Sequence, residues 1–394
     1  TGQRDQNEVI IKKIQMMRKT LKGLLSAALV LASCAERPSL VDPAGFDGEV
    51  DGREVGLYTI ANGRLAMQFT NYGGRVVSLF VPDRNGKYRD VVLGHKTLDE
   101  YVHYTGDRFL GAVVGPVANR ICNAAFTVDG QTYHLSANHG GIGTLHGGFK
   151  GLDSVVWDVM SVTDSSATLH YLHADGQEGF PGNLDITMTY TLTSDEGWDI
   201  SYSATTDATR PVNISNHPYF NLSGEGNGTC EEYVISVNGD SFIGTDGLDV
   251  IETPIPVDGT AFDYRRPHPV RDAITSGDEQ IRRGNYGFDH NYCINGIGMR
   301  SVATAYDTES GIFLEVFSDQ PGLQVYSGQY FSGNEIGKYG GPLVRYGSLT
   351  FETQNYPDAP NKASFPDPYL RPGQVYHHHC LYRFSARRND GVEK

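Results

Sequence analysis

Two short segments of this sequence each place one proton-transferring side chain among aromatic, amide and proline residues. The first, SNHPYFNL, begins at Ser215 and centres on His217; the second, FETQNYPD, begins at Phe351 and centres on Glu352. Histidine and carboxylate side chains are the groups best suited to donate and accept protons near neutral pH. Because the neighbouring rings and amides are groups that a sugar-binding cleft uses, the two segments predict acid–base chemistry on a sugar ring.

Each residue also has a structural interpretation. A histidine followed by Pro218 and two aromatic residues is more often a hydrogen-bonded core residue than a catalyst. Glu352 lies in the strand-like run LTFETQNY among apolar or neutral neighbours. It needs a partner or a function, because burial of a lone carboxylate costs several kcal/mol.

Three further residues could bind a ligand. Asp289 lies in GFDHNY among aromatic residues, and His146 lies in TLHGG, whose glycines permit close approach of a ligand to the backbone. Arg120 ends VANR, and its guanidinium could donate to two hydroxyl groups at once. Each residue also has a structural interpretation: Asp289 could cap a turn, His146 could lie in a loop, and Arg120 could pair with a surface carboxylate.

The elements that must position these residues are predicted to be β-strands. The 394-residue chain contains 47 Gly, 18 Pro, 23 Tyr and 17 Phe, which favours many short strands joined by tight turns. Alternating apolar and polar runs flank Asn62-Gly63, Asn85-Gly86 and Asp129-Gly130, which predicts three hairpins. Helical periodicity is weak beyond the N-terminal region. We expect one all-β domain over residues 47–388, a large antiparallel β-sandwich, with a division into two domains as the alternative.

The N-terminal region is predicted to be a targeting signal. Basic residues precede the apolar run GLLSAALVLAS, which begins at Gly23 and is too short to span a bilayer comfortably. It leads into Leu-Ala-Ser-Cys34, which resembles the lipobox of bacterial lipoprotein signal peptides; an ordinary secretory signal peptide is the alternative. We expect residues 1–33 to be an upstream extension and signal peptide, Cys34 to carry lipid and residues 34–46 to be a tether. The mature protein would then be an exported lipoprotein that faces the periplasm or lies at the outer membrane.

Charge and cysteine content narrow the possible partners. The net charge of −15 argues against binding to nucleic acid. Without residues 1–33 the balance is 26 basic against 45 acidic residues, or −19, which would repel an anionic membrane surface, so the lipid would be the sole membrane contact. The other four cysteines are widely spaced and form no CxxC pair, which leaves buried thiols and disulfides both open. The run HHHC from His377 resembles a metal cluster, but consecutive strand residues point to opposite faces, so we expect it to form part of the last strand.

Taken together, the motifs resemble the aldose 1-epimerase family, the galactose mutarotases. The resemblance extends from about Asn71 to Phe384 and rests on segments that occur in the family's order: NYGGRVVSLFVPD, GPVANRI, LHGG, SNHPYFNL, GFDHNY, QPGLQVYSG and FETQNYPD. It implies a large β-sandwich of the galactose mutarotase type, no metal or other cofactor, and interconversion of the α and β anomers of free aldohexoses such as galactose or glucose. We expect a monomer or a weak dimer.

The resemblance also implies a role for each residue that matches a motif. His217 matches the general acid and Glu352 the general base. The residues that match sugar-contacting positions are Asn119, Arg120, His146, Tyr219, Asp289 and Gln324. One departure is Pro116, where the family usually has Arg, and we expect it to change the loop without loss of the site. Glu352 would start ionised and His217 protonated, with their mutual attraction favouring that state.

Three other functions fit part of the pattern. A glycoside hydrolase could use Asp289 and Glu352 as paired carboxylates but would leave His217 without a role. A sugar-binding lipoprotein could have kept the cleft and lost turnover, although retention of both His217 and Glu352 argues against this. A phosphosugar epimerase would need an additional basic cluster, and none is evident in the sequence.

Overall fold

The three hairpins expected from the turn dipeptides are present. They join β3 (Leu57–Ala61) to β4 (Ala66–Thr70), β5 (Val76–Pro82) to β6 (Tyr88–Asp90), and β9 (Ala125–Val128) to β10 (Gln131–His134). The glycine of each turn has a positive φ between 78° and 85°, a conformation that glycine adopts without steric cost. The turn chemistry in the sequence was therefore sufficient to predict these local pairings.

The computed structural model describes residues 38–104 and 106–387. The predicted signal peptide and Cys34 lie outside the described residues. Within the described part of the chain, no helix is long and apolar enough to cross a bilayer.

Most strands belong to three antiparallel sheets. The nine-stranded sheet has the order β12 (Asp158–Val162), β13 (Ser166–His173), β14 (Leu184–Leu192), β15 (Gly197–Thr206), β30 (Tyr376–Ala386), β26 (Ile312–Ser318), β25 (Arg300–Tyr306), β18 (Val234–Val237) and β23 (His268–Pro269). The five-stranded sheet has the order β22 (Ile255–Pro256), β19 (Gly239–Ile243), β24 (Asp289–Ile294), β27 (Gly322–Tyr326) and β28 (Thr350–Gln354). The four-stranded sheet has the order β3-β4-β5-β6.

Short elements connect and cover these sheets. The two-stranded ribbons, besides β9–β10, are β1 (Gly48–Val50) with β2 (Arg53–Val55), β7 (Val113–Val114) with β17 (Ser215–Asn216), β8 (Arg120–Ile121) with β11 (Thr144–Leu145), β16 (Arg210–Pro211) with β29 (Tyr369–Leu370), and β20 (Thr245–Asp246) with β21 (Asp249–Val250). The α-helices are α2 (Leu98–Val102), α3 (Val270–Ile274) and α4 (Glu279–Arg283). The 3-10 helices are η1 (Pro43–Phe46), η2 (Cys122–Ala124), η3 (Leu152–Ser154), η4 (Gln177–Gly179), η5 (Cys230–Glu232) and η6 (Ala359–Asn361).

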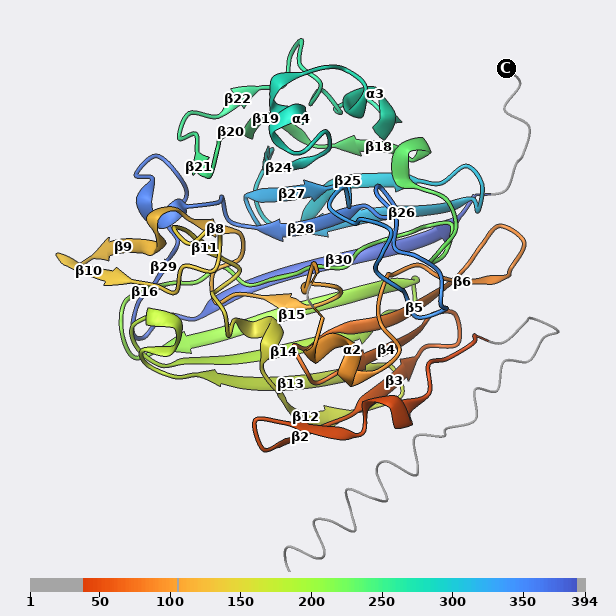
Figure 1. Ribbon diagram of the computed structural model, residues 1–394, viewed down its shortest axis with the longest axis horizontal. Coiled ribbons are helices and arrows are strands. Elements are labelled where there is room, and N and C mark those ends of the chain that lie inside the picture. The colour runs from red at the N-terminus through yellow and green to blue at the C-terminus, as the bar shows by residue number, and fades with distance from the viewer. Residues whose placement is uncertain (1–37, 105, 388–394) are drawn as a thin grey trace, which may run out of the picture. The chain divides into compact units, whose positions relative to one another are not determined.

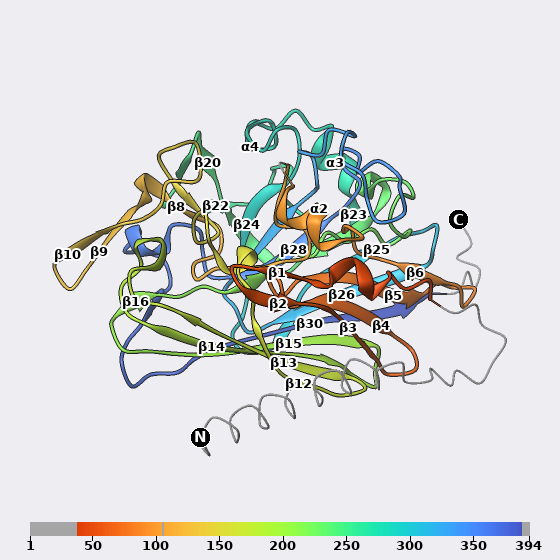
Figure 2. The same cartoon turned by 60° about the horizontal axis from the view of Figure 1, so that its bottom comes forward.

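The sheets share one hydrophobic core, as expected for a β-sandwich. Its buried side chains come from the nine-stranded, five-stranded and four-stranded sheets, for example Ile186, Val325 and Phe69. Strands β12, β13 and β14 lie at one side, while α3 and α4 lie at the opposite side (Figures 1 and 2). Burial alternates along β14 and β30, which is the pattern of strands with one face on the core. The expected all-β sandwich is confirmed.

The last strand accounts for the histidine run. In β30 the exposed His377 is followed by the buried His378, the half-buried His379 and the buried Cys380, so the side chains alternate between the two faces. The ring of His378 bonds to Thr353 and to a backbone carbonyl, and His379 pairs with Asp199. The four cysteines from Cys122 to Cys380 are free thiols.

The folded body begins earlier than the expected boundary at residue 47. Phe46 is buried in a cluster with Tyr101 and Leu98, and Val41 exchanges two backbone hydrogen bonds with the side chain of Gln68. Apolar burial and these bonds attach residues 41–46 to the sandwich, so a free tether can extend at most to about residue 40.

Candidate active site

The first half of the site is carried by the five-stranded sheet. Gln324 of β27 lies opposite Glu352 of the edge strand β28, and Tyr326 of β27 lies opposite Asp289 of β24. A register with period 2 places Gln324 and Tyr326 on the same face of their strand. This sheet therefore presents two carboxylates, an amide and a phenol together.

The second half comes from two short ribbons. β8 pairs with β11 so that Arg120 lies opposite Leu145, which brings Asn119, Arg120 and His146 together. Asn119 and His146 both have a positive φ, of 62° and 51°. Such values are uncommon outside glycine and occur often at functional sites, where the surrounding structure holds them.

The other ribbon, β7 with β17, positions His217. The backbone of His217 donates to Ala112 and accepts from Gly111, while Ser215 of β17 donates to the backbone of Thr353 next to Glu352. These bonds attach the segment that carries the imidazole to the strand that carries the carboxylate. Residues 217 and 352 are thus brought together by long-range backbone pairing.

His217 and Glu352 face each other, as the sequence predicted. Nε2 of His217 lies 3.5 Å from Oε1 of Glu352, and the two residues are only 5% and 2% exposed. Nδ1 of His217 and Oε2 of Glu352 are buried and have no hydrogen-bond partner among the described residues. Each such atom costs about 1–3 kcal/mol unless a bound molecule satisfies it.

Burial dominates the electrostatics of this pair. It raises the pKa of Glu352 well above the usual value, with a further increase from Asp289 and Asp107 that Arg120 partly opposes. Burial also lowers the pKa of His217, although Asp107 and Asp289 oppose that change. Both directions favour the uncharged pair in the empty site. Both directions oppose the expectation that Glu352 starts ionised and His217 protonated, because desolvation disfavours the charged form of each group.

Asp289 and Arg120 form the charged side of the site. Arg120 Nη2 lies 2.9 Å from Asp289 Oδ2, and Gln324 donates to Asp289 Oδ1 at 2.7 Å. Although burial raises the pKa of Asp289, the charge of Arg120 and these hydrogen bonds lower it overall. Both oxygens already have partners, so Asp289 is an ionised residue that orients its neighbours. The glycosidase alternative would leave the imidazole of His217, 3.5 Å from Glu352, without a role. Arg120 takes up this position although Pro116 precedes it.

His146 is fixed in one tautomer. The backbone N–H of Asn119 donates to its Nδ1 at 3.1 Å, and burial lowers the pKa of the ring well below its usual value. A neutral ring that accepts at Nδ1 carries its proton on Nε2, so that nitrogen is a hydrogen-bond donor. His146, His217 and Glu352 do bring three possible ligand atoms within 4.8 Å of one another. A metal at Nε2 of His146 would require the other tautomer and would leave a buried backbone N–H unpaired.

Aromatic rings enclose the imidazole. The Tyr219 ring stacks on His217 at 4.7 Å, Phe109 at 5.9 Å, and the Tyr326 ring approaches edge-on at 6.1 Å. Of these residues, only Tyr219 was expected from the sequence; Asp107, Phe109 and Tyr326 were not. Tyr326 is part of the quoted QPGLQVYSG segment. Asp107 and Phe109 belong to none of the quoted motifs and are marked in the sequence only by their position shortly before Gly111.

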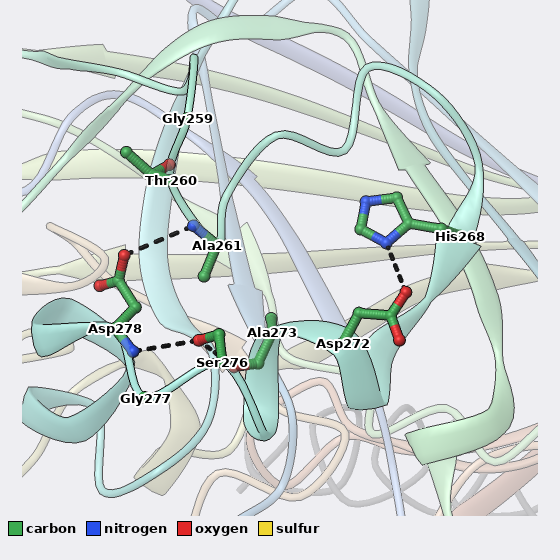
Figure 3. Close-up of a pocket in the computed structure, with 9 residues that line it drawn as sticks. All are labelled: Gly259, Thr260, Ala261, His268, Asp272, Ala273, Ser276, Gly277 and Asp278. Atoms are coloured by element: carbon green, nitrogen blue, oxygen red, sulfur yellow. Dashed lines mark hydrogen bonds and ion pairs between the residues drawn. The ribbon is translucent and has the colours of Figure 1, made fainter.

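Two surface depressions lie outside this site. One, of about 470 Å³, is lined by Gly259, Thr260, Ala261, His268, Asp272, Ala273, Ser276, Gly277 and Asp278 (Figure 3). Its polar groups pair with one another, as in His268–Asp272 at 3.1 Å and the bond from the Asp278 backbone to Ser276. The other, of about 610 Å³, is lined in part by Val212, Asn355 and Tyr376. Neither contains the acid–base pair, so the chemistry identifies the site better than the size of a depression.

A buried imidazole–carboxyl pair beside charged and amide side chains, on a large antiparallel β-sandwich, is typical of a carbohydrate isomerase of the mutarotase fold. The family model for aldose 1-epimerase matches residues 56–383. The chain belongs to the aldose 1-epimerase family. It is an epimerase that interconverts the anomers of aldoses.

Similar proteins agree with this assignment. Galactose mutarotase of Rattus norvegicus is 37% identical over 338 residues, which cover 85% of this chain and 95% of the relative. Aldose 1-epimerase of Escherichia coli is 33% identical over 347 residues, which cover 85% and 97%. Among solved structures, an aldose epimerase homologue from C. elegans matches with a TM-score of 0.78 and 29% identity, covering 85% of this chain and all of that chain. Galactose 1-epimerase from Lactobacillus acidophilus matches with a TM-score of 0.76 and 26% identity, covering 87% and 98%.

Proposed function

We propose that this protein interconverts the α and β anomers of a free aldohexose such as galactose or glucose, with His217 and Glu352 as its acid–base pair. The observation that carries the proposal is the 3.5 Å approach of these two side chains in a buried site. One further polar atom of each remains unpaired there. A ring oxygen and an anomeric hydroxyl are neighbouring atoms of one sugar, so a single hexose can engage both groups.

The proposed reaction conserves protons. Glu352 takes the proton of the C1 hydroxyl while His217 donates one to the ring oxygen, and the C1–O5 bond breaks to give the open-chain aldehyde. Rotation about C1–C2 presents the other face of the carbonyl. Reclosure then returns the proton from Glu352 to the carbonyl oxygen and the O5 proton to His217. No other reactant is consumed.

The remaining side chains are proposed to hold the sugar while C1 moves. Arg120 and Nε2–H of His146 are donors, and Gln324 Oε1 is a buried acceptor without a partner among the described residues. Asn119 orients Arg120 through a 3.0 Å bond to Nη1, and the Tyr219 ring supports the imidazole. Fixed hydroxyls restrict motion to the reacting carbon, which supports catalysis by orientation.

The test is the mutarotation rate of freshly dissolved α-D-galactose, followed by polarimetry with the spontaneous rate subtracted. His217→Asn and Glu352→Gln should each lower kcat by about 10²–10⁴, the usual contribution of general acid–base catalysis. The exposed His103 and the ion-paired Glu315 provide matched controls as His103→Asn and Glu315→Gln, which should keep normal rates. A near-normal rate in either site variant, with the fold intact, would remove that residue from the mechanism. The same assay across a panel of aldoses would identify the preferred sugar.

We also propose that the protein is exported and attached to a membrane through lipid on Cys34. The support is the apolar run that ends at the lipobox-like Leu-Ala-Ser-Cys34. Metabolic labelling with a radioactive fatty acid should label the wild type and not Cys34→Ser, and only the wild type should sediment with membranes. Equal sedimentation of both, with no label, would contradict the anchor. The expected monomer or weak dimer stays a prediction.

A further inference from the structure

Residues 106–110 form one wall of the site and are held from both sides. Arg75 donates to the backbone carbonyls of Arg108 and Leu110 at 2.8 and 3.0 Å, and both arginines pair with the buried Asp153. Arg108 also donates to the carbonyls of Gly148 and Phe149, in the segment that follows His146. The wall is therefore attached to the four-stranded sheet and to the His146 loop.

Asp107, in this wall, contacts two phenols of the site. Tyr219 donates a hydrogen bond to Asp107 Oδ2, and the Tyr326 hydroxyl donates to the same oxygen at 3.5 Å. One carboxylate oxygen therefore accepts from two phenols of the site. The Tyr219 ring that it holds is the one stacked on His217 at 4.7 Å. Asp107 is thus separated from the imidazole by a single aromatic ring.

We propose that Asp107 is a positioning residue for the acid–base pair: it holds the Tyr219 ring against His217 and places a carboxylate one ring away from the imidazole. This inference rests on the proposed function of His217 and Glu352. It gives the site a third carboxylate, with a role distinct from that of Asp289, which is saturated by Arg120 and Gln324.

The charges around His217 make the role of Asp107 specific. The titratable and charged groups that act on His217 and Glu352 or pack against them are Asp107, Asp289, Arg75, Arg120, His146, Tyr219 and Tyr326. Among the charged neighbours that raise the pKa of His217, Asp107 is the strongest, and Asp289 acts less. For Glu352 the order is reversed, since Asp289 raises its pKa more than Asp107 does. Removal of the charge at residue 107 should therefore lower both pKa values.

The experiment is the pH profile of kcat/KM for galactose mutarotation in the full-length protein and its variants. The active His217–Glu352 pair holds one proton, so the profile should be bell-shaped. Activity should fall at low pH as the pair gains a second proton, and at high pH as the pair loses its single proton. Asp107→Asn keeps an oxygen that can accept from Tyr219 and removes the charge. It should move both limbs to lower pH, by on the order of one unit. Asp107→Glu, which restores the charge, should return the profile toward that of the wild type.

Asp99→Asn is the matched control, since Asp99 lies on α2 and its side chain is highly exposed. It changes the net charge equally and should leave the profile in place. A profile of Asp107→Asn that superimposes on the wild type, or an equal shift in both variants, would overturn the inference. If Asp107→Asn does not fold, Asp107→Ser removes the charge with a smaller side chain and decides in the same way. If His217→Asn and Glu352→Gln lose turnover but Asp107→Asn shows no shift of the profile, only the role of Asp107 is rejected. If His217→Asn and Glu352→Gln keep normal turnover, the proposed function itself is rejected.

Discussion

Substitution of Glu352 by Gln should make the folded protein more stable while it lowers activity. The cause is the raised pKa of the buried carboxyl, which must take up a proton or retain a desolvated charge on folding. When the pKa of a carboxyl is higher in the folded protein than in the unfolded chain, its contribution to the stability of the folded protein is complete below the unfolded pKa. That contribution is lost as the pH rises through the folded pKa. The penalty in the wild type is therefore absent below about pH 4.5 and grows above it.

The structure limits the size of this effect. Each pH unit between the unfolded pKa and the working pH contributes at most about 1.4 kcal/mol, so the penalty at pH 7 cannot exceed about 3.4 kcal/mol from the usual value of 4.5. We expect Glu352→Gln to gain about 1–3 kcal/mol at pH 7, or on the order of 2–6 °C in Tm. The gain should vanish near pH 4. Burial also lowers the pKa of His217, so the variant should lose little attraction from a protonated imidazole.

Asp289→Asn is the contrasting variant within the same site. Here the folded pKa is lowered, so removal of the charge should cost stability above the unfolded pKa and leave Arg120 without its partner. The pair is partly buried, which places the loss at about 1–3 kcal/mol, between exposed and buried ion pairs. Thermal unfolding of both variants and the wild type from pH 4 to pH 8 is the assay. A lower Tm for Glu352→Gln at pH 7, or a difference from the wild type that does not change with pH, would refute the burial argument.

Two further substitutions test a buried ion-pair cluster and a glycine next to His146. Lys338→Met should destabilise the protein by about 3–5 kcal/mol in denaturant unfolding, because the ammonium is buried against two buried carboxylates; the exposed Lys150→Met should change stability by less than about 1 kcal/mol. Gly147→Ala should raise KM and lower Tm, since a Cβ there would lie 2.0 Å from a backbone oxygen and displace the adjacent His146, whereas Gly63→Ala, with a similar φ and open space, should leave KM unchanged. A KM that rises equally in both glycine variants would show that backbone strain, and not the collision, is responsible.

Local structure could be predicted from the sequence because its signals are local. Turn dipeptides with positive-φ glycines gave the three hairpins, and period-2 alternation gave the two-faced strands such as β14 and β30. The order of the strands could not be predicted in this way. β30 lies between β15 and β26, and one side of its pairing joins residues about 180 positions apart, as in Ile200 with Cys380. The alternation of buried and exposed residues along a strand is the same whichever strand pairs with it, so this pattern does not identify the neighbouring strand.

The same distinction holds within the candidate site. His217 and Glu352 could be predicted because each lies in a distinctive run of residues, and the structure brings them within 3.5 Å. Asp107 could not, because a single carboxylate in a loop acquires its meaning only when the fold brings it to Tyr219. The early boundary at residue 41 was missed for a similar reason. Val41 and Phe46 are isolated apolar residues whose burial depends on partners far along the chain.

Protonation shows most clearly why the sequence alone was insufficient. Attraction between an imidazolium and a carboxylate favours the charged pair, but burial of both groups favours the neutral one, and the depth of burial is a property of the fold. In the proposed reaction the neutral pair is also the state that accompanies the open-chain aldehyde, since Glu352 has then gained a proton and His217 has lost one. Desolvation therefore stabilises the pair in the form that ring opening requires. The charge of Asp107 favours protonation of His217, which the ionic form that begins each half of the cycle requires. A pair balanced between these two forms can transfer its proton in either direction, as a reaction that must run equally well from both anomers demands.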